Sequence, residues 1–262
     1  MPDLKVLPSE PALPKLAATI LLLRDGTSGL EVLVLEKAAG NHFAGGALVF
    51  PGGKVEPQDA IFGGAIGEQR HSLSILKIAA VREMFEECGI MLARRPGSGH
   101  LMDADEVARC RASGPSTSLL DLAVSEPLEL ATDQMVHFAH WLTPPSRSTR
   151  FDTHFFIAVA PSGQMAATVD GHEIVEANWR RPSDILDEVA AGTLKLVLPT
   201  LMNLDKLSKR VSVDAALATA RVDKVVCVMP RRIDTDDGPQ VCIPAEAGYG
   251  VTTIPAKLLR RA

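Results

Sequence analysis

Three glutamates in one short segment are the residues of this 262-residue chain best suited to chemistry. Glu83, Glu86 and Glu87 stand at relative positions i, i+3 and i+4, which share one face of a helix. Like charges placed in this way repel one another and destabilise an isolated helix. A hard divalent cation such as Mg²⁺ turns that repulsion into attraction, because it binds carboxylate oxygens together with substrate phosphates. The cluster therefore predicts a site that holds a metal against a phosphate.

The residues around the glutamates extend the pattern. Residues 82–90 read Arg-Glu-Met-Phe-Glu-Glu-Cys-Gly-Ile, and about thirty residues upstream residues 50–56 read Phe-Pro-Gly-Gly-Lys-Val-Glu. Together these segments resemble the Nudix box, in which a glycine is followed by five residues, a glutamate, seven residues and then Arg-Glu-apolar-x-Glu-Glu-x-Gly-apolar. The second half of the box matches at every specified position, and Gly53 matches the opening glycine.

The first half of the box departs from the pattern in two ways. Asp59 stands where the box has its first glutamate, and 22 residues rather than seven separate Asp59 from Arg82, so about 15 are inserted. Asp59 keeps the carboxylate on a side chain that is shorter by one methylene. A longer loop costs only roughly 0.6 kcal/mol per doubling of its length. The helix that carries the glutamates remains whole, so the insertion is compatible with a working site.

The resemblance continues beyond the box, over about residues 15–210. Three later segments are similar to the Nudix branch that contains CoA and acyl-CoA diphosphatases. They are Trp-Leu-Thr-Pro at 141–144, Arg-Phe-Asp-Thr-His-Phe-Phe at 150–156, and residues 173–179 with the proline at 182. This implies an α/β fold, a Nudix-type α/β/α sandwich with a mixed β-sheet. It also implies hydrolysis of a nucleoside diphosphate-linked substrate, most readily CoA or acyl-CoA. The alternatives are another nucleotide such as NADH or ADP-ribose, or a non-catalytic Nudix regulator that binds a ligand.

The resemblance also implies roles for the acidic residues. Glu83, Glu86 and Glu87 are expected to hold Mg²⁺ or Mn²⁺, which neutralise charge on phosphoryl oxygens and lower the pKa of a bound water. Glu83 is the first choice for the general base that takes a proton from water. Glu173 or Glu176, on the later segment, is the second choice, and either group would need to lie within hydrogen-bond reach of the water.

Other box positions are expected to shape the site around these acids. Arg82 would orient the carboxylates through charge-assisted hydrogen bonds, with Asp59 as one partner, and is counted with Glu83 and Glu86 among the catalytic group. Gly52 and Gly53 would let the backbone turn tightly and approach the diphosphate. The glycine at position 89 suits the end of the helix.

Some cations and histidines outside the box are candidates for further roles. Arg150 is the arginine expected to grip substrate phosphates, because a guanidinium binds phosphate with two parallel hydrogen bonds. His137 and His140 have a three-residue spacing, which would place them on opposite faces of a strand, so zinc binding by this pair is not expected. Cys88 occupies an unspecified box position and is interpreted as a packing residue.

Composition excludes several classes of partner. The net charge of −5 argues against a general nucleic-acid binder, and no apolar run is long enough to span a bilayer. The four cysteines are too sparse for a disulfide framework, and the N-terminus lacks the pattern of a secretory signal. We therefore expect a cytoplasmic protein with a small-molecule nucleotide or CoA substrate and no nucleic-acid or membrane partner. The oligomeric state is left open, with a homodimer as one option.

One domain with additions is the expected organisation. Residues 1–14 would form a flexible arm, 15–210 the Nudix domain with insertions at about 60–73 and 93–127, and 211–262 a C-terminal extension packed on the same domain. Turn and cap signals predict a hairpin from 17–24 and 30–36 with a five-residue loop. Other strands are predicted at 47–50, 135–142, 154–160, 173–179, 224–229 and 241–243. Helices are predicted at 74–88, 102–111, 184–191, 199–209 and 214–221.

Overall fold

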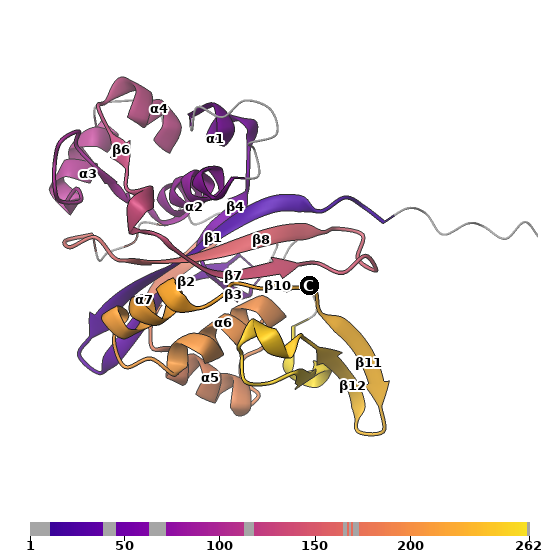
Figure 1. The fold of residues 1–262 in the computed structure, drawn as a ribbon. Helices are drawn as coiled ribbons and strands as arrows, with labels where there is room; N and C mark the ends of the chain where they lie inside the picture. Colours follow the sequence, from indigo (N-terminus) through magenta and orange to yellow (C-terminus); the bar gives the residue numbers. More distant parts are fainter. Residues whose placement is uncertain are drawn as a thin grey trace, which may run out of the picture.

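A mixed β-sheet lies between two layers of helices (Figure 1). The computed structural model describes residues 11–38, 46–62, 72–112, 118–164, 167, 169 and 173–260. The sheet has eight strands, in the order β10-β7-β8-β1-β2-β3, with β4 paired to β1 and β9 paired to β2. The pairs β1–β8 and β10–β7 are parallel and the other pairs are antiparallel. The α/β/α sandwich with a mixed sheet is therefore confirmed.

The strands of the main sheet overlap the predicted segments, except for β4, which was not predicted. Their bounds are β1 Lys15–Gly26, β2 Gly29–Lys37, β3 Leu48–Val49, β4 Gly52–Lys54, β7 Val136–Leu142, β8 Phe151–Val159, β9 Ile174–Arg180 and β10 Cys227–Val228. The predicted hairpin exists, but its five-residue loop was wrong. Gly26 pairs with Gly29, so the turn is closed by two residues between them.

Each face of the sheet carries its own helical layer and its own hydrophobic core. One layer consists of α1 Pro57–Phe62, α2 Leu73–Cys88, α3 Ala104–Ala112 and α4 Leu119–Ser125. The other consists of α5 Pro182–Ala190, α6 Leu198–Ser208 and α7 Val213–Val222. Along β1, Ala18, Ile20 and Leu22 pack on the α2 side, whereas Leu21 and Leu23 pack on the α5–α7 side. This alternation is what a strand buried on both faces requires.

Helix α2 is the element that carries the three glutamates. Its apolar face is fully buried against β1, and Gly89 ends it in the left-handed conformation, with φ 73°, while its N–H donates to Phe85 O. The predicted helix at 74–88 and its glycine stop are thus confirmed. The predicted loop at 60–73 was partly wrong, because Pro57–Phe62 forms α1; residues 63–71 lie outside the described part of the chain.

The segment between α2 and β7 is better ordered than an irregular insertion. It contains β5 Ala93–Arg94 paired with β6 Glu129–Leu130, helices α3 and α4, and the 3₁₀ turn η2 Thr132–Gln134. Asp103 and Glu106 form a reciprocal capping box, since each side chain accepts a hydrogen bond from the other's N–H, at 2.9 and 3.0 Å. Asp103 therefore caps the start of α3, which overlaps the helix predicted at 102–111.

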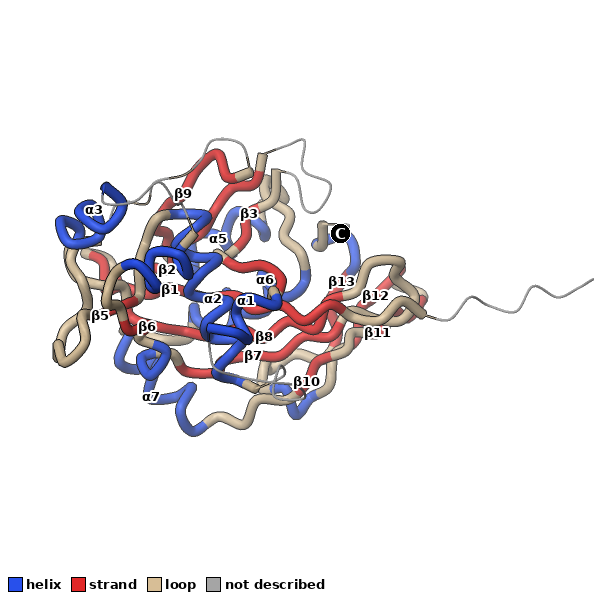
Figure 2. Tube along the Cα trace, turned by 90° about the horizontal axis from the view of Figure 1, so that it is seen from above, coloured by secondary structure: helices blue, strands red, loops and turns tan. Residues whose placement is uncertain are grey.

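The C-terminal segment builds a small second sheet. It comprises β11 Arg231–Thr235, β12 Gly238–Cys242 and β13 Thr253–Pro255, with 3₁₀ turns η3 Ala245–Ala247 and η4 Ala256–Leu258. A tight turn joins β11 to β12, since Thr235 pairs with Gly238. Seen from above, this sheet lies at the end of the molecule where β1 begins (Figure 2). Among the described helices, none has the length and apolar character needed to cross a membrane.

Candidate active site

The centre of the box is a buried guanidinium. Arg82 is 2% exposed and donates through Nε to Asp59 Oδ1 at 2.8 Å and through Nη2 to Asp59 Oδ2 at 3.1 Å. Nη2 also donates to Lys54 O at 2.9 Å, and Nη1 donates to Glu83 Oε1 and Glu86 Oε2, both at 3.0 Å. The rigid guanidinium fork thus fixes three carboxylates and the end of β4 relative to one another.

Asp59 reaches Arg82 in spite of the long insertion between them. It lies in the first turn of α1, is fully buried, and accepts a hydrogen bond from Glu56 N at 2.8 Å. The short helix therefore presents the carboxylate to α2, and the inserted residues follow it. The substitution of aspartate for glutamate at this position leaves a two-pronged ion pair in place.

Glu87 contacts strand β4 at Gly52. Its Oε2 accepts from Gly52 N at 2.9 Å. Burial raises the pKa of Glu87 to about 8, although the Gly52 hydrogen bond and the nearby Lys37 charge oppose the shift. Lys37 Nζ in turn donates to Glu173 Oε1 at 2.8 Å. Lys37 was not predicted from the sequence, because its only signal was a basic residue directly after an apolar strand.

The two glycines are required by close approach. A Cβ on Gly53 would lie 2.4 Å from Glu83 Oε1, and a Cβ on Gly52 would lie 2.5 Å from Ala18 O. The Glu83 carboxylate therefore lies directly on the backbone of Gly53, and the Glu87 carboxylate lies against that of Gly52. Gly52 and Gly53 allow this close contact because neither residue carries a side chain.

The electrostatics of the cluster fit a divalent cation. Burial raises the pKa of Glu83 and of Glu86, whereas the charge and hydrogen bonds of Arg82 lower both. Keeping these groups and Glu87 ionised is therefore costly without a further positive charge. The donors are all carboxylate oxygens, the chemistry preferred by Mg²⁺ and Mn²⁺. The donor chemistry of Glu83, Glu86 and Glu87 therefore fits such an ion.

The guanidinium of Arg150 contacts two backbone carbonyls. Its side chain is buried, with Nε donating to Thr143 O at 3.0 Å and Nη1 donating to Ala12 O at 2.8 Å. The guanidinium thus fastens the chain before β1 to the β7–β8 connection, and phosphate binding by Arg150 stays a prediction. Glu176 is exposed on β9, opposite Glu36 of β2.

The predicted geometry of His137 and His140 was wrong. A β-bulge shifts the register, so that His137 pairs with Phe156 whereas His140 pairs with His154. The extra residue, Phe138, places both histidines on the face of the sheet that carries α2. His137 Nε2 lies 3.1 Å from His154 Nδ1, and the rings of His140 and His154 stack at 3.9 Å.

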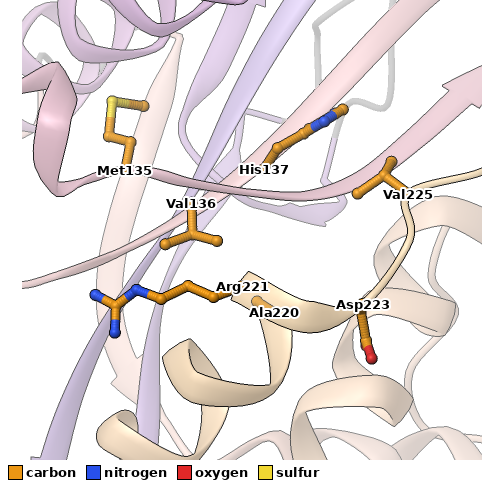
Figure 3. Close-up of a pocket in the computed structure, with 7 residues that line it drawn as sticks. All are labelled: Met135, Val136, His137, Ala220, Arg221, Asp223 and Val225. Carbon is orange, nitrogen blue, oxygen red and sulfur yellow. The ribbon is translucent and has the colours of Figure 1, made fainter.

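A hollow of about 520 Å³ lies elsewhere, at the edge of β7 beside α7 (Figure 3). It is lined by Met135, Val136, His137, Ala220, Arg221, Asp223 and Val225. In Figure 3, Val136 projects toward α7 and His137 projects to the other side of the strand. None of the box glutamates lines this hollow, so it is distinct from the candidate active site.

Known proteins place the chain in a family. The family model described as the NUDT19 Nudix domain matches residues 70–207, which include α2 and its glutamates. The chain belongs to the Nudix hydrolase family. Nudix hydrolases generally use divalent metals, in agreement with the carboxylate cluster. The chain is accordingly a hydrolase that acts on a phosphoric anhydride.

Relatives of this Nudix hydrolase span several sources. A Caenorhabditis elegans protein provisionally named nudix hydrolase 7 is 27% identical over 89% of this chain and 74% of its own length. Acyl-coenzyme A diphosphatase NUDT19 of Xenopus laevis is 23% identical over 70% of this chain and 61% of its own length. The crystal structure of a NUDIX hydrolase from Alicyclobacillus acidocaldarius superposes with a TM-score of 0.68 at 28% identity, covering 81% of this chain and 99% of that chain.

Proposed function

We propose that this Nudix hydrolase is a metal-dependent diphosphatase of CoA or acyl-CoA. The observation that carries the proposal is the close approach of the Glu83 and Glu87 carboxylates to the bare backbone of Gly53 and Gly52, with Glu86 held beside Glu83 by Arg82. A diphosphate is strongly anionic, so three carboxylates would repel it unless they held a cation between themselves and the substrate. We assign Mg²⁺ or Mn²⁺ to that position.

The residues around the ion have separate roles in positioning and in proton transfer. When bound, the ion neutralises charge on the phosphoryl oxygens and makes water a better nucleophile. Arg82 is a positioning residue, because its Nη1 holds the carboxylates of Glu83 and Glu86 at 3.0 Å. We propose that Glu83, whose carboxylate lies against Gly53, is the general base that accepts a proton from the attacking water. Glu173 is less suited to that role, since its carboxylate is paired with Lys37.

The choice of CoA rests on resemblance. The likeness to the CoA diphosphatase branch and the names of the Xenopus laevis and Gallus gallus relatives support it. This chain spans only 61–62% of the length of those relatives. An acyl-CoA substrate is therefore a proposal for this chain. The products would be adenosine 3′,5′-bisphosphate and (acyl-)phosphopantetheine. A non-catalytic regulator is disfavoured because the box keeps all three carboxylates.

A direct assay tests the proposal. The purified chain is incubated with Mg²⁺ or Mn²⁺ and, separately, with CoA, acetyl-CoA, NADH and ADP-ribose, and the products are separated by chromatography. We expect hydrolysis of CoA or acetyl-CoA. Turnover of NADH or ADP-ribose alone would replace the CoA assignment with the second substrate class. Turnover of none would favour the regulator.

A matched pair of glutamate variants tests the metal site. Glu86→Gln removes one anionic ligand and should reduce kcat at least about 100-fold, the scale seen when one group leaves a preorganised charge-stabilising site. Glu246→Gln makes the same chemical change at an exposed position in η3 and should leave kcat unchanged. A Glu86→Gln variant as active as the wild type would remove the assignment of the metal to this helix.

A further inference from the structure

A second group of metal-binding side chains lies outside the Nudix box. His140 of β7 and Asp152 and His154 of β8 are all half-buried, and one donor atom of each lies within 4.8 Å of the other two. His140 Nε2 is 2.5 Å and His154 Nε2 is 3.8 Å from the same oxygen, Asp152 Oδ1. Two imidazole nitrogens therefore converge on one carboxylate oxygen.

The sheet register places this cluster beside the box. Gly53 pairs with Ala18, Ala18 pairs with His154, and His154 pairs with His140, so one row crosses four strands at one level. Directly paired residues project to the same face, and Ala18 packs in the core beneath α2. With strands about 4.8 Å apart, the backbone of His154 is about 10 Å from that of Gly53. The histidines and the carboxylate of Glu83 thus share one face of the sheet.

A third histidine supports the cluster from behind. Because of the β-bulge, His137 reaches the ring of His154, with Nε2 at 3.1 Å from its Nδ1. This contact fixes the orientation of the His154 ring and leaves its Nε2 facing Asp152. A ligating histidine commonly has its second ring nitrogen held in this way by an outer partner.

We infer that His140, Asp152 and His154 bind a transition-metal ion of the zinc class at a site separate from the box. Imidazole nitrogen with a single carboxylate suits Zn²⁺, Fe²⁺, Ni²⁺ or Cu²⁺, whereas the all-carboxylate box suits Mg²⁺ or Mn²⁺. Asp152 makes the cluster a cation site, since a carboxylate at its centre would repel a phosphate. The site therefore takes a different ion from the box, on the same face of the sheet.

The distances are compatible with one shared ion. Metal–ligand bonds of about 2.0–2.1 Å in a tetrahedral site place neighbouring donor atoms about 3.3 Å apart. The two separations from Asp152 Oδ1, 2.5 and 3.8 Å, lie on either side of that value. Small side-chain rotations would equalise them. Three protein ligands leave a fourth position for water or another small ligand.

Cobalt binding to the full chain tests the inference, because Co²⁺ replaces Zn²⁺ and absorbs visible light. The titration is performed in excess Mg²⁺, which occupies the box carboxylates. We expect one equivalent of Co²⁺ to bind, to develop a d–d absorption band and to be displaced by Zn²⁺. The same binding is expected in Glu86→Gln, so a failure of the proposed Nudix chemistry and a failure of this site give different results.

Four variants locate the site. Asp152→Asn and His140→Ala each remove a ligand and should weaken Co²⁺ binding at least about 100-fold, and His137→Phe should weaken it about 10-fold through the outer contact. His100→Ala, at an exposed histidine before α3, should bind as the wild type does. Circular dichroism verifies that each variant folds. If His140→Ala does not fold, Co²⁺ binding by Asp152→Asn, whose side chain has nearly the same shape as the original, tests the site. No cobalt band in the wild type, or unchanged binding in Asp152→Asn, would overturn the inference.

Discussion

At the scale of single residues, the ion pair of Arg82 and Asp59 dominates the candidate site. Both side chains are almost fully removed from solvent, at 3% and 0% exposure. Desolvating two charges offsets much of their attraction, so such a pair adds little net stability compared with a well-packed apolar pair. Its value here is geometric, because the same guanidinium holds Glu83 and Glu86 in place.

Breaking this pair should therefore be costly. Asp59→Asn leaves the buried Arg82 charge without its two-pronged partner and should lower the free energy of unfolding by about 3 kcal/mol. Urea denaturation measures the change. Asp205→Asn, which removes the exposed i,i+4 partner of Lys209, is the matched control and should cost less than about 1 kcal/mol. Equal effects of the two substitutions would contradict a central role for Asp59.

The raised pKa of Glu87 gives a pH prediction with a definite sign. Burial lifts this pKa from 4.5 to about 8, so the folded chain binds the Glu87 proton more tightly than the unfolded chain does. When a chelator removes divalent metal, the stabilisation that comes from this tighter proton binding by Glu87 is complete below about pH 4.5. It is lost as the pH rises through about 8. Glu87→Gln imitates the protonated form, so its melting temperature should exceed that of the wild type more at pH 8.5 than at pH 6.

Metal binding is expected to depend on pH in the opposite direction. An ion at Glu87 competes with the proton, so the apparent affinity for Mg²⁺ should rise with pH until about pH 8. Thermal melting with and without Mg²⁺ at pH 6, 7 and 8 measures the trend. An affinity that does not vary with pH would show that Glu87 is not among the ligands.

At the scale of elements, strand β4 and helix α2 make the site by direct contact. Gly53→Ala would insert a methyl group 2.4 Å from Glu83 Oε1, and the carboxylate would have to move. Because that atom ends a flexible side chain, we expect activity to fall at least about 10-fold with little loss of stability. Steady-state kinetics and thermal melting separate the two effects. Gly99→Ala has no atom within 4 Å of the added Cβ and should alter neither.

Local sequence signals explain which elements were predictable. Helix α2 was foreseen because apolar spacing and the glycine at 89 agree, and the spacing of the box glutamates fixed their shared face. Helix α1 was missed because it is only six residues long and lacks an apolar period. The β-bulge at Phe138 was missed because the extra residue is defined by pairing with β8, which no local pattern encodes. That one register shift explains why the faces on which His137 and His140 lie were predicted wrongly. It also explains why the cluster that the histidines form was not predicted.

At the scale of the whole molecule, the C-terminal segment is joined to the Nudix domain through a buried polar chain. Trp141 Nε1 donates to Tyr249 Oη at 3.0 Å, and Tyr249 Oη donates to Asn203 Oδ1 at 2.9 Å. Ile243 and Ile254 pack in the same core as α6 and α7. These contacts place β12 and β13 against the sheet face opposite the box. That 211–262 is an extension of a single domain remains a prediction consistent with this packing.

Tyr249→Phe tests how much this attachment contributes. The change leaves the Trp141 N–H and the Asn203 carbonyl buried without their partner, and should lower the free energy of unfolding by about 1–3 kcal/mol. In a Trp141→Phe background one of these partners is already gone, so the same substitution should cost less, and a double-mutant cycle measures the difference. Because the tyrosine lies on the face opposite α2, kcat at saturating substrate should stay unchanged wherever the protein remains folded. A fall in kcat without a fall in stability would instead connect the C-terminal segment to the active site through the sheet.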